Sequence, residues 1–397
     1  MAGIAAPNPA GARGNWLATR IFNTIRFSTM NIFMLLGAVG TAFGGPWTWA
    51  GFGLSFILMS YVDELVGDAG NGEDLPPVWY MQTMVYITLP IIILCTLVTV
   101  TLLKPYGVDW IDGALGFLGF DMDYSRANSN FSDYVGAIVS LGMFYGLAGV
   151  NVAHELVHRT DSKIAQIWGR WLLAFTWDTG FSIEHVYGHH RYVGTEQDPA
   201  TPRRGEYIMT FQRRSTKGQM INAYKHERER LKRKGITDQI WNNRFWRGQG
   251  MTVVVVVCFV LLLGPIGLPI SFFAGYVGKT YLEVVNYIEH YGLVRVPGTP
   301  VEARHSWDCY RRLTSGMFYN LQLHANHHRN ATKRFWELKQ LHDEAPLLPM
   351  GYMPMALLAF IPFLWPKIIN PLLADWDKRL ASPAEREYLR ERGMLMG

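Results

Sequence analysis

The chain contains few cysteines and few charged residues for its length. Only three of its 397 residues are cysteine, and Cys95, Cys258 and Cys309 are far apart. Without a CxxC pair, neither a thiolate metal site nor a disulfide framework is expected. Charged residues make up 17% of the chain and hydrophobic residues 49%, whereas a soluble domain carries about 25% charge. The shortage of charge predicts a surface that faces lipid.

Long uncharged runs predict six membrane-spanning helices, because a helix needs about 20 apolar residues to cross a bilayer. Residues 28–62 carry no charge and are interrupted by Gly-Gly-Pro at 44–46, which predicts two short spans joined by a tight turn. A third span is expected in 79–103 and a fourth in 131–158. Residues 250–290 contain two more, separated by the sequence GPIGLP.

The distribution of basic residues predicts which side of the membrane each loop occupies. Residues 159–249 hold 17 Lys and Arg, whereas 104–130 hold only Lys104 and Arg126. Since Lys and Arg accumulate on the cytoplasmic side, residues 159–249 are expected there. Three arginines before residue 27 place the N-terminus on the same side, which requires an even number of crossings before residue 159. We do not expect the basic residues of 159–249 to bind nucleic acid.

Histidine is also scarce, with 12 in the chain, but it is strongly clustered. Four motifs, HELVH, EHVYGHH, NYIEH and HANHH, hold nine of them: His154, His158, His185, His189, His190, His290, His324, His327 and His328. Residues three and four apart are neighbours on a helix, so each multi-histidine motif should point two or three imidazoles the same way. Packed imidazoles repel one another once protonated, and a metal ion relieves this by binding one nitrogen of each. The motifs therefore predict a metal site, although His290 alone would be read as an ordinary polar residue at the membrane interface.

The number of histidines indicates how many ions could bind. Imidazole suits zinc, copper, iron and nickel. One zinc ion takes three or four protein ligands, and nine histidines are about twice that number. Two ions with four or five imidazoles each fit, and two redox-active irons are the expectation for an oxygen-activating membrane site, with zinc and copper open on the count alone.

A different class of protein is compatible with part of this pattern. HELVH matches the HExxH signature, in which Glu155 would be the general base of an intramembrane zinc protease. That reading leaves seven histidines without a role. A histidine-rich metal transporter is a further alternative.

Carboxylates close to the motifs are candidates to orient the imidazoles through their second ring nitrogen. Asp198 and Glu289 are the first choices, followed by Glu155 and Glu184. For Glu155 and Glu184, a surface role beside the basic loop is the alternative.

These assignments predict an all-α integral membrane protein with a cytoplasmic, histidine-rich di-metal domain. Its expected segments are a cytoplasmic N-terminal segment (1–27), four transmembrane helices ending in the first histidine motif (28–158), a basic cytoplasmic insertion with the second (159–249), two transmembrane helices (250–291) and a cytoplasmic C-terminal region with the last (292–397). Within that region, residues 351–373 are apolar but contain four prolines. Proline removes helix hydrogen bonds that lipid cannot replace, so an interfacial segment is expected there instead of a seventh span.

The motifs resemble those of a known family. HELVHR, EHVYGHH and LQLHANHH are similar to the three histidine boxes of membrane di-iron desaturases and hydroxylases. NYIEHYGL and DPATPRRGE (198–206) resemble segments of the AlkB-type alkane 1-monooxygenases in particular. The resemblance runs from about residue 28 to 375 and departs at Leu323 and Asn326, where many relatives have Arg and Asp.

The resemblance implies terminal hydroxylation of medium- or long-chain n-alkanes to 1-alkanols, in the bacterial inner membrane with the site on the cytoplasmic side. It implies a non-haem centre of two iron ions, O₂ as co-substrate, and electrons from rubredoxin, which a rubredoxin reductase supplies. Because the chain has no CxxC pair, rubredoxin would be a separate polypeptide or domain. Aryl-methyl hydroxylation and fatty-acyl desaturation are the alternatives that the same scaffold would support.

Overall fold

The fold is entirely helical. The computed structural model describes residues 9–70 and 75–396, and over these ranges it contains no β-strand. Two isolated bridges, Asp68 with Arg311 and Asp308 with Leu347, are its only β-type pairings. The all-α prediction is therefore confirmed for the described residues.

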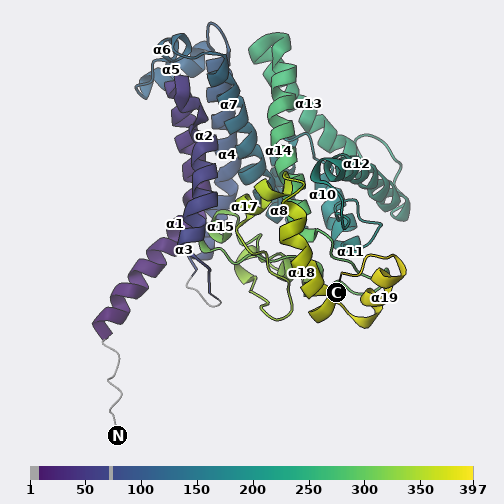
Figure 1. The fold of residues 1–397 in the computed structure, drawn as a ribbon. Coiled ribbons are helices and arrows are strands. Elements are labelled where there is room, and N and C mark those ends of the chain that lie inside the picture. The colour runs from purple at the N-terminus through teal and green to yellow at the C-terminus, as the bar shows by residue number, and fades with distance from the viewer. Residues whose placement is uncertain (1–8, 71–74, 397) are drawn as a thin grey trace.

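Within residues 9–70 and 75–396, five helical stretches are long and apolar enough to cross a membrane. They are Leu17–Phe43, Gly45–Val66, Val78–Leu103, Phe131–His158 and Arg244–His290. The last stretch is 47 residues long, and a glycine with a φ of +73°, Gly264, breaks it into α13 (Arg244–Leu263) and α14 (Gly267–His290). These two helices pack along each other (Figure 1). The predicted division of this region into two helices is thus present, while six crossings stay a prediction.

The first helix differs in length from the predicted one. Helix α1 (Pro9–Phe43) begins well before residue 28, and its apolar part starts at Leu17. Arg26 was expected outside the span, but its side chain is buried, and its Nη1 donates a hydrogen bond to the carbonyl oxygen of Arg312 at 3.0 Å. Neighbouring protein thus accommodates the charge, so the helix continues past it. Residues 1–8 of the expected N-terminal segment lie outside the described residues.

The predicted turn at 44–46 is confirmed. Gly44 and Gly45 have φ values of +69° and +54°, which a residue with a side chain rarely adopts. They end α1 and lead into a second helical stretch. Its parts are η1 (Gly45–Trp49), α2 (Ala50–Ile57), the π-helix η2 (Leu58–Val62) and α3 (Asp63–Val66).

A continuous helix carries the first histidine motif to the site. It consists of α7 (Phe131–Phe144), the π-helix η3 (Tyr145–Val150) and α8 (Asn151–His158). Glycines let it lie directly against α14: a Cβ on Gly142 would lie 2.7 Å from the carbonyl oxygen of Ala274, and one on Gly278 would lie 3.1 Å from that of Gly142. Small residues permit such close approach between membrane helices. The contact aligns the two helices so that their histidine-bearing ends lie together.

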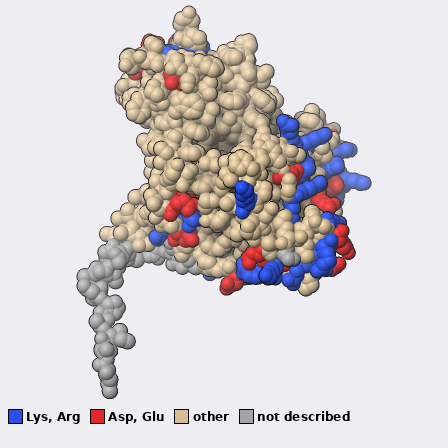
Figure 2. All heavy atoms as spheres, viewed as in Figure 1, with Lys and Arg blue, Asp and Glu red and all other residues tan. Residues whose placement is uncertain are grey.

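The remaining helices occupy the two ends of this bundle. Helix α4 (Val78–Leu103) completes the bundle, and α5 (Asp109–Phe117) and α6 (Met122–Ala127) cap the end far from the histidines. At the histidine end lie α9 (Lys163–Ala174), α10 (Phe181–Glu184), η4 (His185–His189), α11 (His190–Tyr192), α12 (Ile208–Arg233), η6 (Ala303–His305), α15 (Arg312–Met317), α16 (His324–Arg329), η7 (Phe335–Glu337), α17 (Tyr352–Ala359), α18 (Trp365–Arg379) and α19 (Pro383–Glu391). Most of the Lys, Arg, Asp and Glu visible in Figure 2 gather at this end, while the bundle surface is almost free of them.

The proline-containing run near the C-terminus forms two short helices, α17 and α18. Neither is among the helices long and apolar enough to span a membrane in the described part of the chain. They pack against the end of α14, where the ring centroids of Tyr287 and Trp365 are 5.3 Å apart. An interfacial position for them stays a prediction.

A buried ion pair holds the C-terminal helices to the rest of the histidine end. The guanidinium of Arg204 makes two hydrogen bonds with the Asp377 carboxylate, at 2.6 and 2.8 Å. It also donates to the carbonyl oxygens of Gly292 and Met394, both at 2.8 Å. Both charged side chains are at most 3% exposed.

Replacing Arg204 with alanine should strongly destabilise the protein. The change leaves Asp377 buried without its partner, and breaking a buried pair in this way costs about 3–5 kcal/mol. Thermal unfolding in detergent measures the effect. The control is Arg379→Ala, whose pair with Asp375 is more than half exposed and should contribute less than about 1 kcal/mol. Equal losses in the two variants would contradict the structural role of Arg204.

Candidate metal centre

The nine clustered histidines converge into two groups. One contains five imidazoles and the other four, and within each group the candidate ligand nitrogens lie within 4.8 Å of one another. The five-histidine group is His154, His158, His185, His190 and His327, and the four-histidine group is His189, His290, His324 and His328. Such spacing fits one metal ion per group.

The second motif is divided between the two groups. It lies on the π-helix η4 and the start of α11, where His185 and His190 face the five-histidine group and His189 faces the other. The hydrogen bonds of a π-helix join residues five apart, so His185 and His190 come together, with 3.1 Å between their Nε2 atoms. The two imidazoles of this motif that face the same group are therefore five residues apart, and not three or four as on an α-helix.

The third motif is divided in the same manner. His324 and His328 are one α-helical turn apart on α16 and join the four-histidine group, whereas His327 joins the five-histidine group. Two of its three imidazoles, four residues apart, thus face the same group. The start of this short helix is held by Asp308, whose Oδ1 accepts a hydrogen bond from the backbone N–H of Ala325 at 2.7 Å.

Five of the imidazoles have lowered pKa values, which favour their neutral form. Burial, and then the neighbouring imidazoles, lower the pKa of His185, His190, His324 and His328 well below the ordinary value. Burial and the neighbouring His189 lower the pKa of His327 to about 3. Metal binding requires neutral imidazole, so these residues need no further deprotonation near neutral pH.

The ring nitrogens have few partners other than one another. Nε2 of His324 lies 3.0 Å from that of His290 and 3.0 Å from that of His328. Nε2 of His154 and of His158 is buried and has no hydrogen-bond partner among the described residues. Buried polar atoms without partners are costly, and a metal ion accepts the lone pairs of several at once. The donor set of both groups therefore fits a metal ion.

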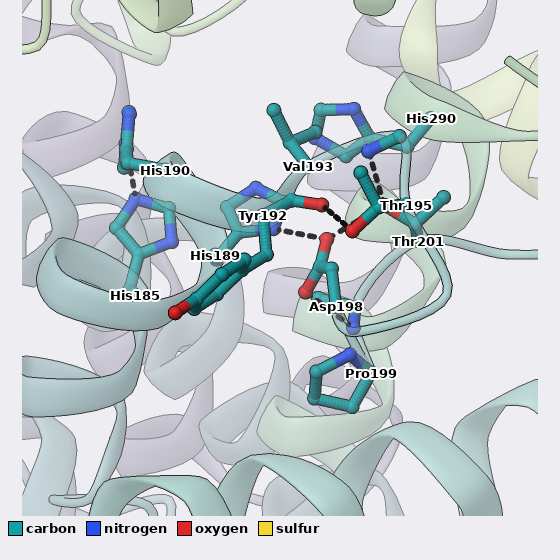
Figure 3. A network of polar contacts seen from close by, with 12 residues as sticks. His185, His189, His190, Tyr192, Val193, Thr195, Asp198, Pro199, Thr201 and His290 are labelled. Carbon is teal, nitrogen blue, oxygen red and sulfur yellow. Dashed lines mark hydrogen bonds and ion pairs between the residues drawn. The ribbon is translucent and has the colours of Figure 1, made fainter. Parts of the chain in front are cut away.

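Asp198 orients one ligand candidate. Its Oδ2 lies 2.8 Å from Nδ1 of His189 and accepts a hydrogen bond from the hydroxyl of Thr201 at 2.6 Å. Figure 3 shows Asp198 between the imidazole of His189 and the side chain of Thr201. Burial opposes ionisation of Asp198, but its contacts with His189, Thr201 and the Ala200 backbone lower its pKa below the ordinary value. A negative carboxylate on Nδ1 leaves Nε2 of His189 available for a metal.

Glu289 lies at the site in a different way. Its Oε2 is 3.2 Å from Nε2 of His324, the nitrogen that faces the other imidazoles, and its Oε1 accepts a hydrogen bond from the Tyr352 hydroxyl at 2.6 Å. The carboxylate therefore borders the ligand side of the four-histidine group and does not contact the outer nitrogen of His324.

The other two predicted carboxylates do not contact the imidazoles. Glu155 accepts hydrogen bonds from Nε and Nη2 of Arg159 at 3.1 and 2.9 Å. Glu184 is buried, and neither of its oxygens has a hydrogen-bond partner among the described residues. Burial, and then the nearby Asp198, raise the pKa of Glu184 well above the ordinary value.

An apolar slot leads from the bundle to both groups. It runs between the η3–α8 helix and α14, which line it with residues one turn apart along each helix. On one side these are Gly146, Leu147, Val150, Asn151 and His154, and on the other Tyr281, Leu282, Val285, Asn286 and Glu289. His185 and His324 close the metal end, and Phe181, Phe318, Leu321 and Tyr352 complete the walls. The slot thus places apolar side chains directly beside histidines of both groups.

Sequence reasoning missed three side chains that support the site. Thr201, Asp308 and Tyr352 bind Asp198, the start of α16 and Glu289 respectively. A hydroxyl residue three positions after Asp198 is a local signal that could have identified Thr201. Asp308 and Tyr352 contact residues distant in the chain, for which a single sequence contains no signal.

Replacing Asp198 with asparagine should weaken metal binding at the four-histidine group. The change keeps the shape but removes the negative charge that polarises His189, and such a loss typically lowers metal affinity by about 10–100-fold. Metal titration of the purified protein measures it. Glu196→Gln, two residues away on an exposed side chain, is the matched control and should bind metal normally. An unchanged affinity in Asp198→Asn would contradict the orienting role.

The metal-free protein should lose stability as the pH falls below about 6.5. The pKa of His327 is about 3 in the fold against an ordinary 6.5, so between these values the unfolded chain binds a proton that the folded chain does not. Protonation therefore favours unfolding over this range, and the penalty is absent above pH 6.5. Melting temperatures of chelator-treated protein at pH 8 and 5.5 test this. His327→Gln, which cannot titrate, should show a smaller drop than the parent protein, and equal drops would contradict the prediction.

Comparisons with known proteins identify the family. Residues 131–359 match the family model described as fatty acid desaturase. The chain is 33% identical to alkane 1-monooxygenase 2 of Pseudomonas aeruginosa, over 84% of this chain and 86% of that protein. It is 32% identical to alkane 1-monooxygenase 2 of Alcanivorax borkumensis, over 82% of each. It is also 30% identical to the xylene/toluene monooxygenase hydroxylase component XylM of Pseudomonas putida, over 92% and 93%. With its paired histidine groups, the chain belongs to the fatty acid desaturase family of multi-pass membrane proteins and, within it, to the AlkB-type alkane 1-monooxygenases.

Proposed function

We propose that this protein hydroxylates the terminal carbon of medium- or long-chain n-alkanes to give 1-alkanols, using O₂ and electrons delivered by rubredoxin. The observation that carries the proposal is the slot between η3–α8 and α14, which joins an apolar helix bundle to both histidine groups. The relatives named alkane 1-monooxygenase support the choice of substrate and of O₂.

Each histidine group would hold one iron ion, giving two per chain. Five imidazoles and four imidazoles are available, and neither group includes a cysteine or a carboxylate among the described residues. Imidazole is a good ligand for iron. When bound, iron supplies the redox chemistry with O₂ that zinc, which has no redox chemistry, cannot.

The residues of the chain would bind, orient and shield the substrate. Along the slot, Leu147, Val150, Leu282 and Val285 offer only hydrocarbon surface, which excludes water and favours an alkyl chain. Terminal C–H bonds are the strongest in a linear alkane, so oxidation at the end must come from positioning. A slot whose metal end is closed by His185 and His324 presents one end of the chain there.

A membrane location favours collection of the substrate. At about 0.8 kcal/mol per CH₂, an eight-carbon alkane gains roughly 6 kcal/mol on moving from water into lipid, a concentration gain of order 10⁴ or more. Since the slot lies between η3–α8 and α14, an alkane dissolved in the bilayer would reach it from between membrane helices, without passage through water.

The proposed setting is the bacterial inner membrane, with six crossings and the histidine groups on the cytoplasmic side. The concentration of charged residues at the histidine end supports this orientation (Figure 2). Rubredoxin and its reductase would then deliver electrons from the cytoplasm.

An intramembrane zinc protease fits the structure less well. The general base of such an enzyme must face the metal-bound water, but Glu155 is engaged by two nitrogens of Arg159. Both histidines of HELVH also belong to a five-histidine group, which exceeds the three protein ligands of a catalytic zinc.

Replacing His327 with alanine should abolish alkane hydroxylation and lower the iron content. The imidazole is one of five in its group, and the purified parent protein should contain about two iron ions per chain, measured by elemental analysis. His342→Ala, at a histidine outside both groups, is the control and should keep full activity. Full activity in His327→Ala, or one zinc per chain in the parent, would contradict the proposal.

The similarity to XylM makes aryl-methyl hydroxylation the second candidate activity. Product analysis with O₂ and a rubredoxin system, offering octane and xylene in parallel, separates the two. We expect 1-octanol as the principal product. Oxidation of the xylene methyl group with no 1-octanol would favour the second candidate.

A further inference from the structure

A basic pocket lies on the surface beside the second histidine motif. It has a volume of about 560 Å³ and is formed by the C-terminal half of α12, by the η4–α11 segment and by the first residue of α13. Its lining residues are Val186, Tyr187, Arg191, Tyr192, His226, Glu229, Arg230, Arg233, Lys234 and Arg244. Nothing in the proposed reaction uses this pocket.

The pocket has a large excess of positive charge. It contains five cationic side chains and one carboxylate. Arg230 and Arg244 share one buried carboxylate, that of Glu227, at 2.6 and 2.8 Å. The side chains of Arg191, Arg233 and Lys234, by contrast, are exposed and form no ion pair with a carboxylate of the described residues. In Figure 2 the blue side chains on this flank lie where Figure 1 draws α12.

The loop next to the pocket carries apolar side chains that face outward. Every residue from 232 to 241 is exposed. Among them, Ile240 is 66% and Trp241 is 68% exposed, and Trp246, in the first turn of α13, is 43% exposed. Such exposure is unfavourable in water, whereas tryptophan is enriched at the level of lipid headgroups.

The position of the loop along the chain also places it at the level of the lipid headgroups. Arg244, which lines the pocket, is also the first residue of a stretch long and apolar enough to span a membrane. Beyond it, Val253 and Leu261 on α13 are 59% and 77% exposed, as lipid-facing residues are. The pocket therefore lies where a membrane helix emerges among headgroups.

We propose that this pocket binds the phosphate headgroup of an anionic phospholipid. Arg and Lys bind phosphate through charge-assisted hydrogen bonds, and basic pockets at the ends of membrane helices bind acidic headgroups in this way. Ile240, Trp241 and Trp246 anchor the adjoining loop in the same leaflet. The inference is independent of the proposed reaction, because it involves neither the metal nor the slot.

The bound headgroup contacts the outer face of the second histidine motif. Val186 and Tyr187 lie between His185 and His189 in the chain, and Arg191 directly follows His190. The ring of Tyr187 lies 5.3 Å from the guanidinium carbon of Arg244. A lipid phosphate bound by Arg191, Arg233 and Lys234 therefore lies against η4 and α11.

Native mass spectrometry of the full chain in detergent tests the proposal, with dioleoylphosphatidylglycerol and dioleoylphosphatidylcholine as probes. Phosphatidylglycerol should bind at least about tenfold more tightly, and the double variant Arg233→Gln/Lys234→Gln should lose about tenfold or more of that affinity. The matched control is Arg213→Gln/Lys217→Gln, which removes two exposed cations of α12 outside the pocket. It should bind phosphatidylglycerol like the parent protein.

Three results would overturn the proposal. Equal losses of phosphatidylglycerol affinity in the two double variants would show that the lipid binds to basic surface in general and not to this pocket. Binding of inorganic phosphate as tight as that of phosphatidylglycerol, lost in Arg233→Gln/Lys234→Gln, would show a site for a free anion. Loss of rubredoxin binding in that variant, with phosphatidylglycerol binding unchanged, would show a protein-docking surface. Melting temperature and metal content, unchanged in both variants, establish that each is folded.

Discussion

Two groups of closely spaced imidazoles, nine in all, are the constraint on which the rest of the structure depends. Each brings polar nitrogen into a region with few other hydrogen-bond partners, and the facing Nε2 atoms of His290, His324 and His328 cannot all donate to one another. Such a cluster is tolerable only around ions that share the lone pairs. Much of the surrounding architecture serves to assemble it: the glycine contact of α7 with α14, the π-helix η4, and the carboxylates that hold His189 and α16.

The sequence reveals which residues form the two histidine groups because histidine is rare in this chain. Twelve histidines in 397 residues leave little ambiguity when nine of them lie in four short motifs. The breaks in the apolar runs are equally visible, since Gly44, Gly45 and Gly264 adopt positive φ angles where turns were expected. These features depend on local composition and local backbone conformation, so a single sequence contains them.

Other features depend on contacts between distant segments. The α-helical periodicity used to read the second motif gives the wrong partners, because η4 is a π-helix that pairs His185 with His190. The charge of Arg26 led to a predicted span that begins after it. The sequence does not show that this side chain binds the backbone of Arg312, which is 286 residues away. Asp198 could be proposed as a partner of a histidine because it lies only nine residues after His189. Tyr352 and Glu289 are 63 residues apart, so the sequence gives no sign of their hydrogen bond.

The division of the second and third motifs between the two groups has a mechanical consequence. His189 and His190 are consecutive residues that serve different groups, and so are His327 and His328. Consecutive Cα atoms are a fixed 3.8 Å apart, so two short lengths of covalent chain tie one ion position to the other. The polypeptide thus limits how far the two histidine groups can move apart. A backbone displacement in one group would therefore also shift the other group.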